Sequence, residues 1–296
     1  MSKVEGEVME PAGRILVVHT KDEPFEEQPF VIHLLAEEWR ARGIPVEVTD
    51  TLPEPTGPDV LVFPHTDITA IPPPLAEVLS RCGRVINRAV TDISKRAISR
   101  YLVGSPDEYD GAVIVKTNLN YGGKPEMRIV AARGGEPWDR LQNYLRVPWP
   151  VSGILNAEEY PIFREARNVP PLVWENPRLV VEKFLPEREG NLYGLRQYIF
   201  LGDVEFNTRA LSKSMLVKSR GIVHREMLAS TPHGVRALRD QLGFDYGKFD
   251  YVMHDGEPIV FDVNRTFSYD PESKTGSAGQ MVPRLADGIR QFMGGE

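Results

Sequence analysis

Two acids and an amide near the end of the chain have the spacing of a metal site. Residues 248–264 form two short apolar runs on either side of an Asp-Gly pair at 255–256, a sequence that favours a hairpin. With the turn centred on the glycine, Asp250 lies opposite Asp262. Asn264 follows on the same face because side chains alternate along a strand. The pattern therefore gathers three oxygen-bearing side chains on one face.

Opposed carboxylates repel each other and destabilise a sheet unless a cation lies between them. Hard oxygen ligands suit magnesium, which keeps its other coordination positions for water and phosphate. We therefore predict that Asp250, Asp262 and Asn264 are magnesium ligands, with room for one or two ions. The alternative that spacing alone leaves open is a solvent-facing hairpin with scattered acids.

A second candidate is a lysine at the end of an apolar strand. Lys116 closes the run 111–116, and a loop at 118–124 that contains Gly122 and Gly123 follows it. A strand-end lysine can place its charge on a phosphate while loop N–H groups surround the anion. The loop lacks the glycine and Ser/Thr spacing of a Walker A motif. An ordinary strand-end lysine with a β-turn remains the alternative.

A third candidate is the charged pair that ends the strand 178–184. Glu182 and Lys183 precede Leu185, and a proline halts the strand directly afterwards. A carboxylate or a backbone carbonyl at this point could accept the adenine amino group or a ribose hydroxyl. The alternative is a strand that simply leaves the core.

The first third of the chain predicts a small parallel sheet. Short apolar runs alternate with helical patterns, and strand–helix–strand units of this kind form parallel sheets with right-handed crossovers. The expected strands are 14–19, 46–48, 59–63 and 84–86, and the expected helices are 28–42 and 75–81.

The remainder predicts a mostly antiparallel domain, so the fold class is α/β followed by α+β. A basic helix at 91–101 leads into it, and the stretch 131–177 shows only weak periodicity. The expected strands are 111–116, 178–184, 195–201, 204–211, 248–253 and 258–264, with a closing helix at 282–292. We divide the chain into a flexible leader at 1–12, an N-terminal domain at 13–90 and a second domain at 91–296.

Charge and cysteine content narrow the classes of partner. The chain of 296 residues has 42 acidic and 35 basic side chains, a net charge of −7. Nucleic acids and anionic membrane surfaces call for a basic face, so neither is an expected partner. Cys82 is the single cysteine, which excludes a disulfide framework and favours a cytoplasmic location. The first residues have no apolar core of a signal peptide.

Taken together and in this order, these elements resemble the ATP-grasp family, to which glutathione synthetase and D-alanine–D-alanine ligase belong. The resemblance runs from about residue 87 to the C-terminus, and the preceding segment resembles the family's N-terminal domain. It implies an N-terminal α/β domain before an ATP-grasp domain, with ATP and magnesium as cofactors. Two departures are plain: only 21 residues separate Lys95 from Lys116, and Asp262 stands where glutamate is commoner.

The resemblance also implies a role for each matching residue. The first nucleotide lysine of the family is matched by Lys95 or its neighbour Arg96, and the second is matched by Lys116. The phosphate loop is matched by Gly122 and Gly123. Glu182, Lys183 and Leu185 match the adenine hinge, Arg196 the arginine near the phosphates, and Asp250, Asp262 and Asn264 the magnesium ligands.

The implied activity is ATP- and magnesium-dependent ligation of a carboxylate to an amine or thiol through an acyl-phosphate. The substrates would be small molecules or peptides, and a homodimer is compatible with the sequence. Arg209 belongs to a basic stretch that a solvated face would also explain, but in this fold it is our candidate for orienting the acid. A hydroxyl kinase and a non-catalytic nucleotide-binding module remain alternatives.

Overall fold

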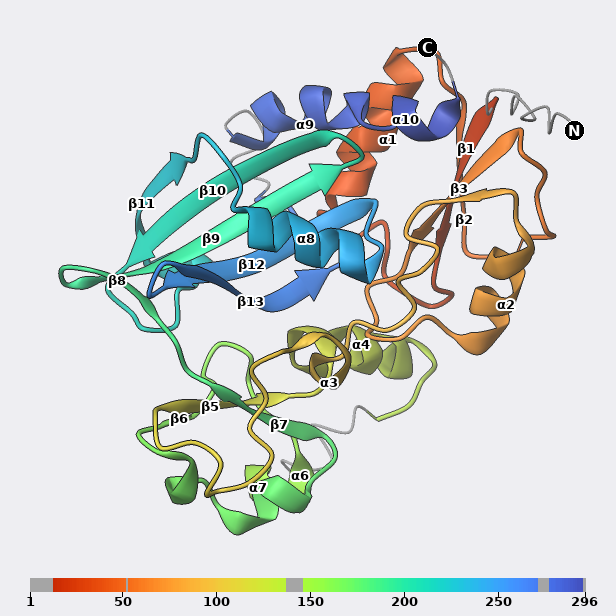
Figure 1. Cartoon of the computed structure of the whole chain (residues 1–296). Coiled ribbons are helices and arrows are strands. Elements are labelled where there is room, and N and C mark those ends of the chain that lie inside the picture. Colours follow the sequence, from red (N-terminus) through yellow and green to blue (C-terminus); the bar gives the residue numbers. More distant parts are fainter. Residues whose placement is uncertain (1–12, 52, 137–145, 271–276, 295–296) are drawn as a thin grey trace, which may run out of the picture.

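The described residues form three β-sheets (Figure 1). We analysed a computed structural model, which describes residues 13–51, 53–136, 146–270 and 277–294. The predicted leader at 1–12 lies outside these residues. The combination of a parallel N-terminal sheet with antiparallel sheets confirms the predicted fold class.

The N-terminal sheet is parallel and has the strand order β2-β1-β3-β4. Helix α1 buries Ile32, Leu35 and Trp39 along one face, and a run of prolines opens α2, where a missing N–H costs no helical hydrogen bond. The elements are β1 (Arg14–His19), α1 (Val31–Ala41), β2 (Val46–Thr49), β3 (Val60–His65), α2 (Pro73–Arg81) and β4 (Arg84–Val85).

A three-stranded antiparallel sheet in the order β6-β5-β7 follows, with its own apolar core. Of the helix predicted at 91–101, only Lys95–Ile98 is helical. The elements are α3 (Lys95–Ile98), β5 (Val113–Thr117), η1 (Asn120–Gly123), α4 (Lys124–Ala132), α6 (Trp149–Ser152), β6 (Ile162–Phe163), η2 (Ala166–Asn168), α7 (Pro171–Glu175) and β7 (Leu179–Lys183).

The largest sheet is antiparallel, with the order β11-β10-β9-β12-β13 and with β8 paired to β9. The predicted closing helix divides into α9 and α10. The elements are β8 (Glu187–Glu189), β9 (Leu192–Leu201), β10 (Val204–Ser212), η3 (Ser219–Gly221), β11 (Ile222–Met227), α8 (His233–Leu242), β12 (Tyr246–His254), β13 (Glu257–Asn264), α9 (Ser277–Asp287) and α10 (Arg290–Met293).

One hydrophobic core joins the N-terminal sheet to the large sheet. It contains Trp39 of α1, Phe63 of β3, Ile199 of β9 and Leu285 of α9, all buried. Helix α9 lies beside α1 (Figure 1), and the Trp39 indole N–H donates to the carbonyl of Ala286 at 3.0 Å. The N-terminal sheet, the large sheet and α9 are therefore packed into one body.

The two faces of the large sheet have different coverings, because side chains alternate along its strands. On β9, Tyr198 and Phe200 pack in a second core with Val235 and Leu238 of α8. Ile199, on the opposite face, belongs to the core that includes α1 and α9. In the described part of the chain, no helix is long and apolar enough to cross a membrane.

Candidate active site

A bulge in the β12–β13 hairpin sets the register of the candidate metal ligands. The turn has two residues, Asp255 and Gly256, with φ of 50° and 85°, so the prediction of a turn centred on the glycine is wrong. A two-residue turn alone would pair Asp250 with Phe261. The register instead shifts at Phe261, and Asp250 is paired with Asp262 as expected.

These residues border a cavity of about 620 Å³ between the three sheets. It contains most of the predicted site residues: Lys95, Lys116, Lys183, Leu185, Asp250, Asp262 and Asn264. Residues almost 170 positions apart in sequence therefore converge on one cavity, and the hairpin face is an inner wall rather than a solvent-facing surface.

Lysines neutralise both carboxylates of the hairpin. Lys95, from α3, is buried and forms an ion pair with Asp262, whose side chain is 25% exposed. Burial alone would lower the pKa of Lys95, but the Asp262 carboxylate outweighs it and raises that pKa. Burial would raise the pKa of Asp262, but Lys95 and then Lys116 hold it below its usual range. Asp250 lies 3.2 Å from Lys248 and accepts a hydrogen bond of 3.0 Å from Gln197.

The strand-end lysine also has a carboxylate partner. Lys116 on β5 lies 2.5 Å from Glu182 on the adjacent strand β7, and both side chains are buried. Its ammonium is also 4.9 Å from the ring centroid of Phe261, the residue that bulges from β13. Glu182 therefore lies behind Lys116 and is not among the residues that line the cavity. The next residue, Lys183, reaches the ring of Tyr109 at 4.9 Å.

The glycine loop bends the chain from β5 into α4. Tyr121, Gly122 and Gly123 have φ of 43°, 72° and 78°, left-handed values that glycine adopts without strain. The cavity wall here is formed by Asn120 and Tyr121, and the two predicted glycines are not among its lining residues. The glycines shape the loop, while the residues before them face the cavity.

The two predicted arginines lie on the other face of the large sheet. Arg196 and Arg209 are directly opposite each other on β9 and β10. Because Gln197 points to Asp250, its neighbour Arg196 points away from the cavity. Arg196 donates to both carboxylate oxygens of Glu187, with hydrogen bonds of 2.9–3.2 Å, and Arg209 lies 2.8 Å from the same carboxylate. Neither arginine lines the cavity, so the structure does not bring Arg196 to the expected phosphate site or Arg209 to the expected acid site, and we expect both to stabilise the sheet instead.

Several cavity residues did not stand out in the sequence. Gln197, Lys248 and Phe261 line the cavity, and their strand phase relative to Asp250 is the signal that could have found them. Lys218 belongs to the basic stretch for which a solvated face was the alternative, yet it is partly buried and donates to the Ala157 carbonyl at 2.7 Å. Burial lowers the pKa of Lys218.

The donor set fits a hard divalent cation that is shared with phosphates. Among the described residues, no three His, Cys, Asp or Glu side chains converge as metal ligands. A cation on this hairpin would therefore rest on two carboxylates, the Asn264 amide and oxygens from its ligand. Magnesium, which is commonly held by one or two carboxylates plus substrate phosphates, has these requirements.

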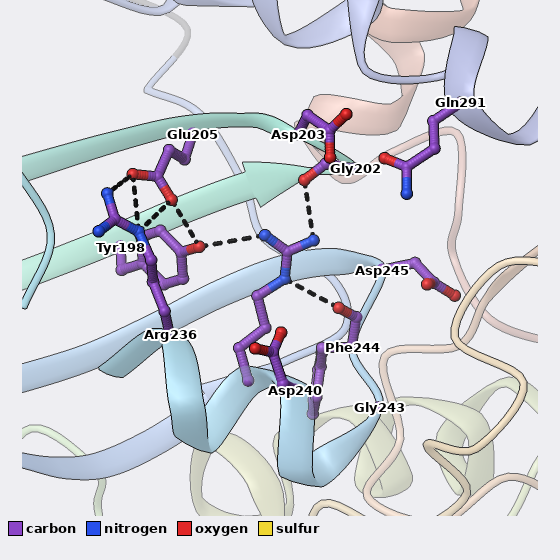
Figure 2. A pocket seen from close by; sticks show the side chains of 11 residues that line it. Tyr198, Gly202, Asp203, Glu205, Arg236, Asp240, Gly243, Phe244, Asp245 and Gln291 are labelled. Carbon is purple, nitrogen blue, oxygen red and sulfur yellow. Dashed lines mark hydrogen bonds and ion pairs between the residues drawn. The ribbon is translucent and has the colours of Figure 1, made fainter. Parts of the chain in front are cut away.

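A second cavity, of about 520 Å³, is a weaker candidate because none of the predicted site residues line it, and its arginines contact neighbouring groups (Figure 2). Arg236 makes hydrogen bonds to both carboxylate oxygens of Glu205. Arg239 donates to the Phe244 carbonyl, to the Tyr198 hydroxyl and to the Gly202 carbonyl, at 2.8–3.1 Å. Burial raises the pKa of Tyr198 to about 12, so the phenol stays neutral.

Solved structures with the same arrangement of sheets identify the fold. The ATP-grasp ligase PsnB, complexed with a minimal precursor, matches 95% of this chain and 99% of its own at a TM-score of 0.52, with 13% identity. The chain has the ATP-grasp fold. PsnB with precursor peptide PsnA2 and AMPPNP matches 96% of the chain and 99% of its own, at a TM-score of 0.52 and 14% identity.

A further match is an ATP-grasp RimK domain protein from Sphaerobacter thermophilus, at a TM-score of 0.46 and 14% identity, over 95% of this chain and 100% of that one. No protein-family model and no curated protein sequence matches the chain. The ATP-grasp fold is thus recognised here from structure, and the resemblance predicted from the sequence is confirmed at the level of the fold.

Proposed function

We propose that the chain is an ATP- and magnesium-dependent ligase that joins the carboxylate of a small amino-acid or peptide-like substrate to an amine or thiol. The observation that carries the proposal is the single cavity that lines up Lys95, Lys116, Asp250, Asp262 and Asn264. Cationic and acidic groups alternate around it, as the binding of a polyphosphate with its counter-cation requires.

Each group has a defined task in this proposal. Lys95 and Lys116 stabilise negative charge on the phosphates, and Asp250, Asp262 and Asn264 hold the cation. Magnesium, when bound, neutralises phosphate charge and orients the transferring group. Lys183 and Leu185 contact the nucleotide base, and the apolar ring of Phe261 forms part of the same wall.

The bonds in the reaction balance without a protein nucleophile. The substrate carboxylate oxygen takes the γ-phosphoryl group from ATP, which leaves ADP and an acyl-phosphate. The amine nitrogen then bonds to the acyl carbon. The bond between the acyl carbon and the phosphate oxygen breaks at the same time, and inorganic phosphate and one proton are released. Structures of PsnB, which has this fold, hold magnesium with ADP, or AMPPNP with a precursor peptide, and this supports the nucleotide part of the proposal.

Hydroxylamine provides a test that does not require the natural amine. The protein is incubated with magnesium-ATP, hydroxylamine and a panel of amino acids and short peptides as acids, and hydroxamate and ADP are measured. We expect both products in equal amounts with at least one acid, and neither with Asp262→Asn. Asp203→Asn, a carboxylate change in the second cavity, serves as the matched control and should retain activity.

Two results would overturn the proposal. One is the absence of any thermal shift with millimolar magnesium-ATP, since a ligand of the native state must stabilise it. The other is a phosphate group left on a substrate hydroxyl with no hydroxamate formed, which is the result expected for a kinase.

A further inference from the structure

Residues that follow strands of the N-terminal sheet form part of the cavity wall. The chain passes from β1 to β2 on one side and then crosses to β3 on the other, so the order reverses between β1 and β3. In open α/β sheets, ligands bind outside the carboxyl ends of strands at such a switch point. Asp67 follows the carboxyl end of β3, and it lines the cavity together with Gln28 and Phe30.

Asp67 has one strong partner and one weak one. Its Oδ1 accepts a hydrogen bond of 2.6 Å from the Thr266 hydroxyl, while its Oδ2 lies 3.8 Å from the guanidinium of Arg128. Thr266 comes two residues after Asn264, so this end of the cavity adjoins the predicted metal ligands. Arg128 also lines the cavity, and its side chain is 35% exposed, so it is accessible to a ligand.

A buried amide acceptor lies at the same end. Asn120, at 2% exposure, donates through Nδ2 to the Asp67 carbonyl at 3.2 Å and lines the cavity. Its Oδ1 has no hydrogen-bond partner within the described residues. An unpartnered buried acceptor is costly unless a ligand or water supplies a donor. Asn120 and Asp67 together present acceptors for an N–H group.

The other charged groups near Asp67 do not line the cavity and have contacts of their own. Glu126 accepts both hydrogen bonds from Thr69, of 2.8 and 2.6 Å, on its Oε1, and its buried Oε2 has no hydrogen-bond partner within the described residues. The buried guanidinium of Arg265 donates to four backbone carbonyls, including those of Ile68 and Val90. Burial, and then the Asp67 charge, raise the pKa of Glu23 to about 8, so it carries a proton at neutral pH. Of these charged groups, Asp67 and Arg128 line the cavity, as one anion and one cation 3.8 Å apart.

We propose that Asp67 and Arg128 bind the amine substrate as a free α-amino acid, Asp67 its ammonium group and Arg128 its carboxylate. This rests on the proposed function, because an acyl-phosphate needs an amine next to the phosphate end of the cavity. An α-amino acid carries its opposite charges one carbon apart, which matches neighbouring side chains of opposite sign. Asn120 supplies a further acceptor for the ammonium group.

The test measures binding of free amino acids to the whole chain saturated with magnesium and AMPPNP. Each common amino acid is titrated by calorimetry, and the best one is compared with its decarboxylated amine and its deaminated acid. We expect the amino acid to bind at least tenfold more tightly than either counterpart. Asp67→Asn and Arg128→Gln should each weaken it at least tenfold and leave AMPPNP affinity unchanged. Asp203→Asn is the control and should bind as the parent does.

Asp67→Asn is suited to the test because an asparagine Oδ1 can still accept the Thr266 hydrogen bond, and its melting temperature should stay near that of the parent. The inference is overturned if no amino acid binds while AMPPNP does, or if Asp67→Asn binds the amino acid as tightly as the parent. Equal affinity for the decarboxylated amine would overturn the assignment of Arg128. If AMPPNP fails to bind the parent, the nucleotide proposal fails, whereas amino-acid binding that is lost in Asp67→Asn still supports this subsite.

Discussion

Asp250 and Asp262 are paired across β12 and β13 only because the strand bulges at Phe261. Without this extra residue, the two-residue turn would place Asp262 opposite Phe249, and its side chain would point to the other face of the sheet. The bulge therefore does two things at once. It puts the second acid on the cavity face, and it leaves the Phe261 ring beneath the ammonium of Lys116.

Replacing Asp262 by Asn should destabilise the protein even without ligands. Repulsion between the paired acids taken alone would favour the variant, but the structure shows that Asp262 forms an ion pair with the buried Lys95. Removing one member leaves a buried charge without its partner, so the free energy of unfolding should fall by about 2 kcal/mol or more. Urea denaturation measures this. Asp250→Asn, with its partners Lys248 and Gln197, is the comparison, and an equal or smaller loss for Asp262→Asn would contradict the prediction.

Phe261→Leu should weaken nucleotide binding and leave the fold intact. Leucine keeps the apolar character of the bulge but removes the ring that faces the Lys116 ammonium at 4.9 Å. A cation–ring contact of this kind contributes roughly 1 kcal/mol, so we expect the Kd for magnesium-ATP to rise about fivefold. Calorimetric titration gives the value. An unchanged Kd with an unchanged melting temperature would remove Phe261 from the nucleotide wall.

Arg209→Lys should lower stability and leave nucleotide affinity unaltered. Arg209 contacts three carboxylates on the far face of the sheet, those of Glu187, Glu189 and Glu226. A lysine has the charge but not the planar group that reaches them together, so we expect a loss of about 1 kcal/mol in unfolding free energy. Denaturation and ATP titration are run on the same sample. A tenfold change in Kd without a change in stability would return this arginine to the active site.

The protein should lose stability between pH 5 and pH 8 through Glu23. Burial, and then Asp67, raise its pKa from 4.5 to about 8. The folded state therefore binds a proton that the unfolded state releases, and stability falls as pH rises through this window. Glu23→Gln removes the titration, so its stability relative to the parent should be greater at pH 8.5 than at pH 5, by about 4 kcal/mol. Melting curves across pH check this, and parallel profiles for the two proteins would refute it.

The sequence was informative where chemistry depends on local spacing. The acid, acid-x-Asn pattern of Asp250, Asp262 and Asn264 pointed to one face of a hairpin, and the structure has that face lining the cavity. The pairing was correct although the turn was not, because the bulge at Phe261 compensates for the two-residue turn. The Asp-Gly pair at 255–256 is typical of a two-residue turn, whereas the bulge was not visible in the sequence because bulges have no strong local signature.

Strand phase and long-range packing could not be predicted. Arg196 is adjacent to Gln197, and only the register against β12 decides which of them faces Asp250. Asp67 is one polar residue after a strand, and it reaches the cavity because the N-terminal sheet packs against the large one. Asp67 and Thr266, for example, are 199 positions apart in the sequence. No short sequence pattern encodes a contact between residues so far apart.

The shared core has a consequence for how the cavity opens. Trp39, Phe63, Ile199 and Leu285 bind the N-terminal sheet and the large sheet into one unit, whereas the three-stranded sheet has a core of its own. Motion should therefore be concentrated in β5, β6 and β7. These strands would carry Lys116 and Lys183 away from the unit formed by the N-terminal sheet and the large sheet. Asp67 and the paired acids would keep their mutual distance during such a movement.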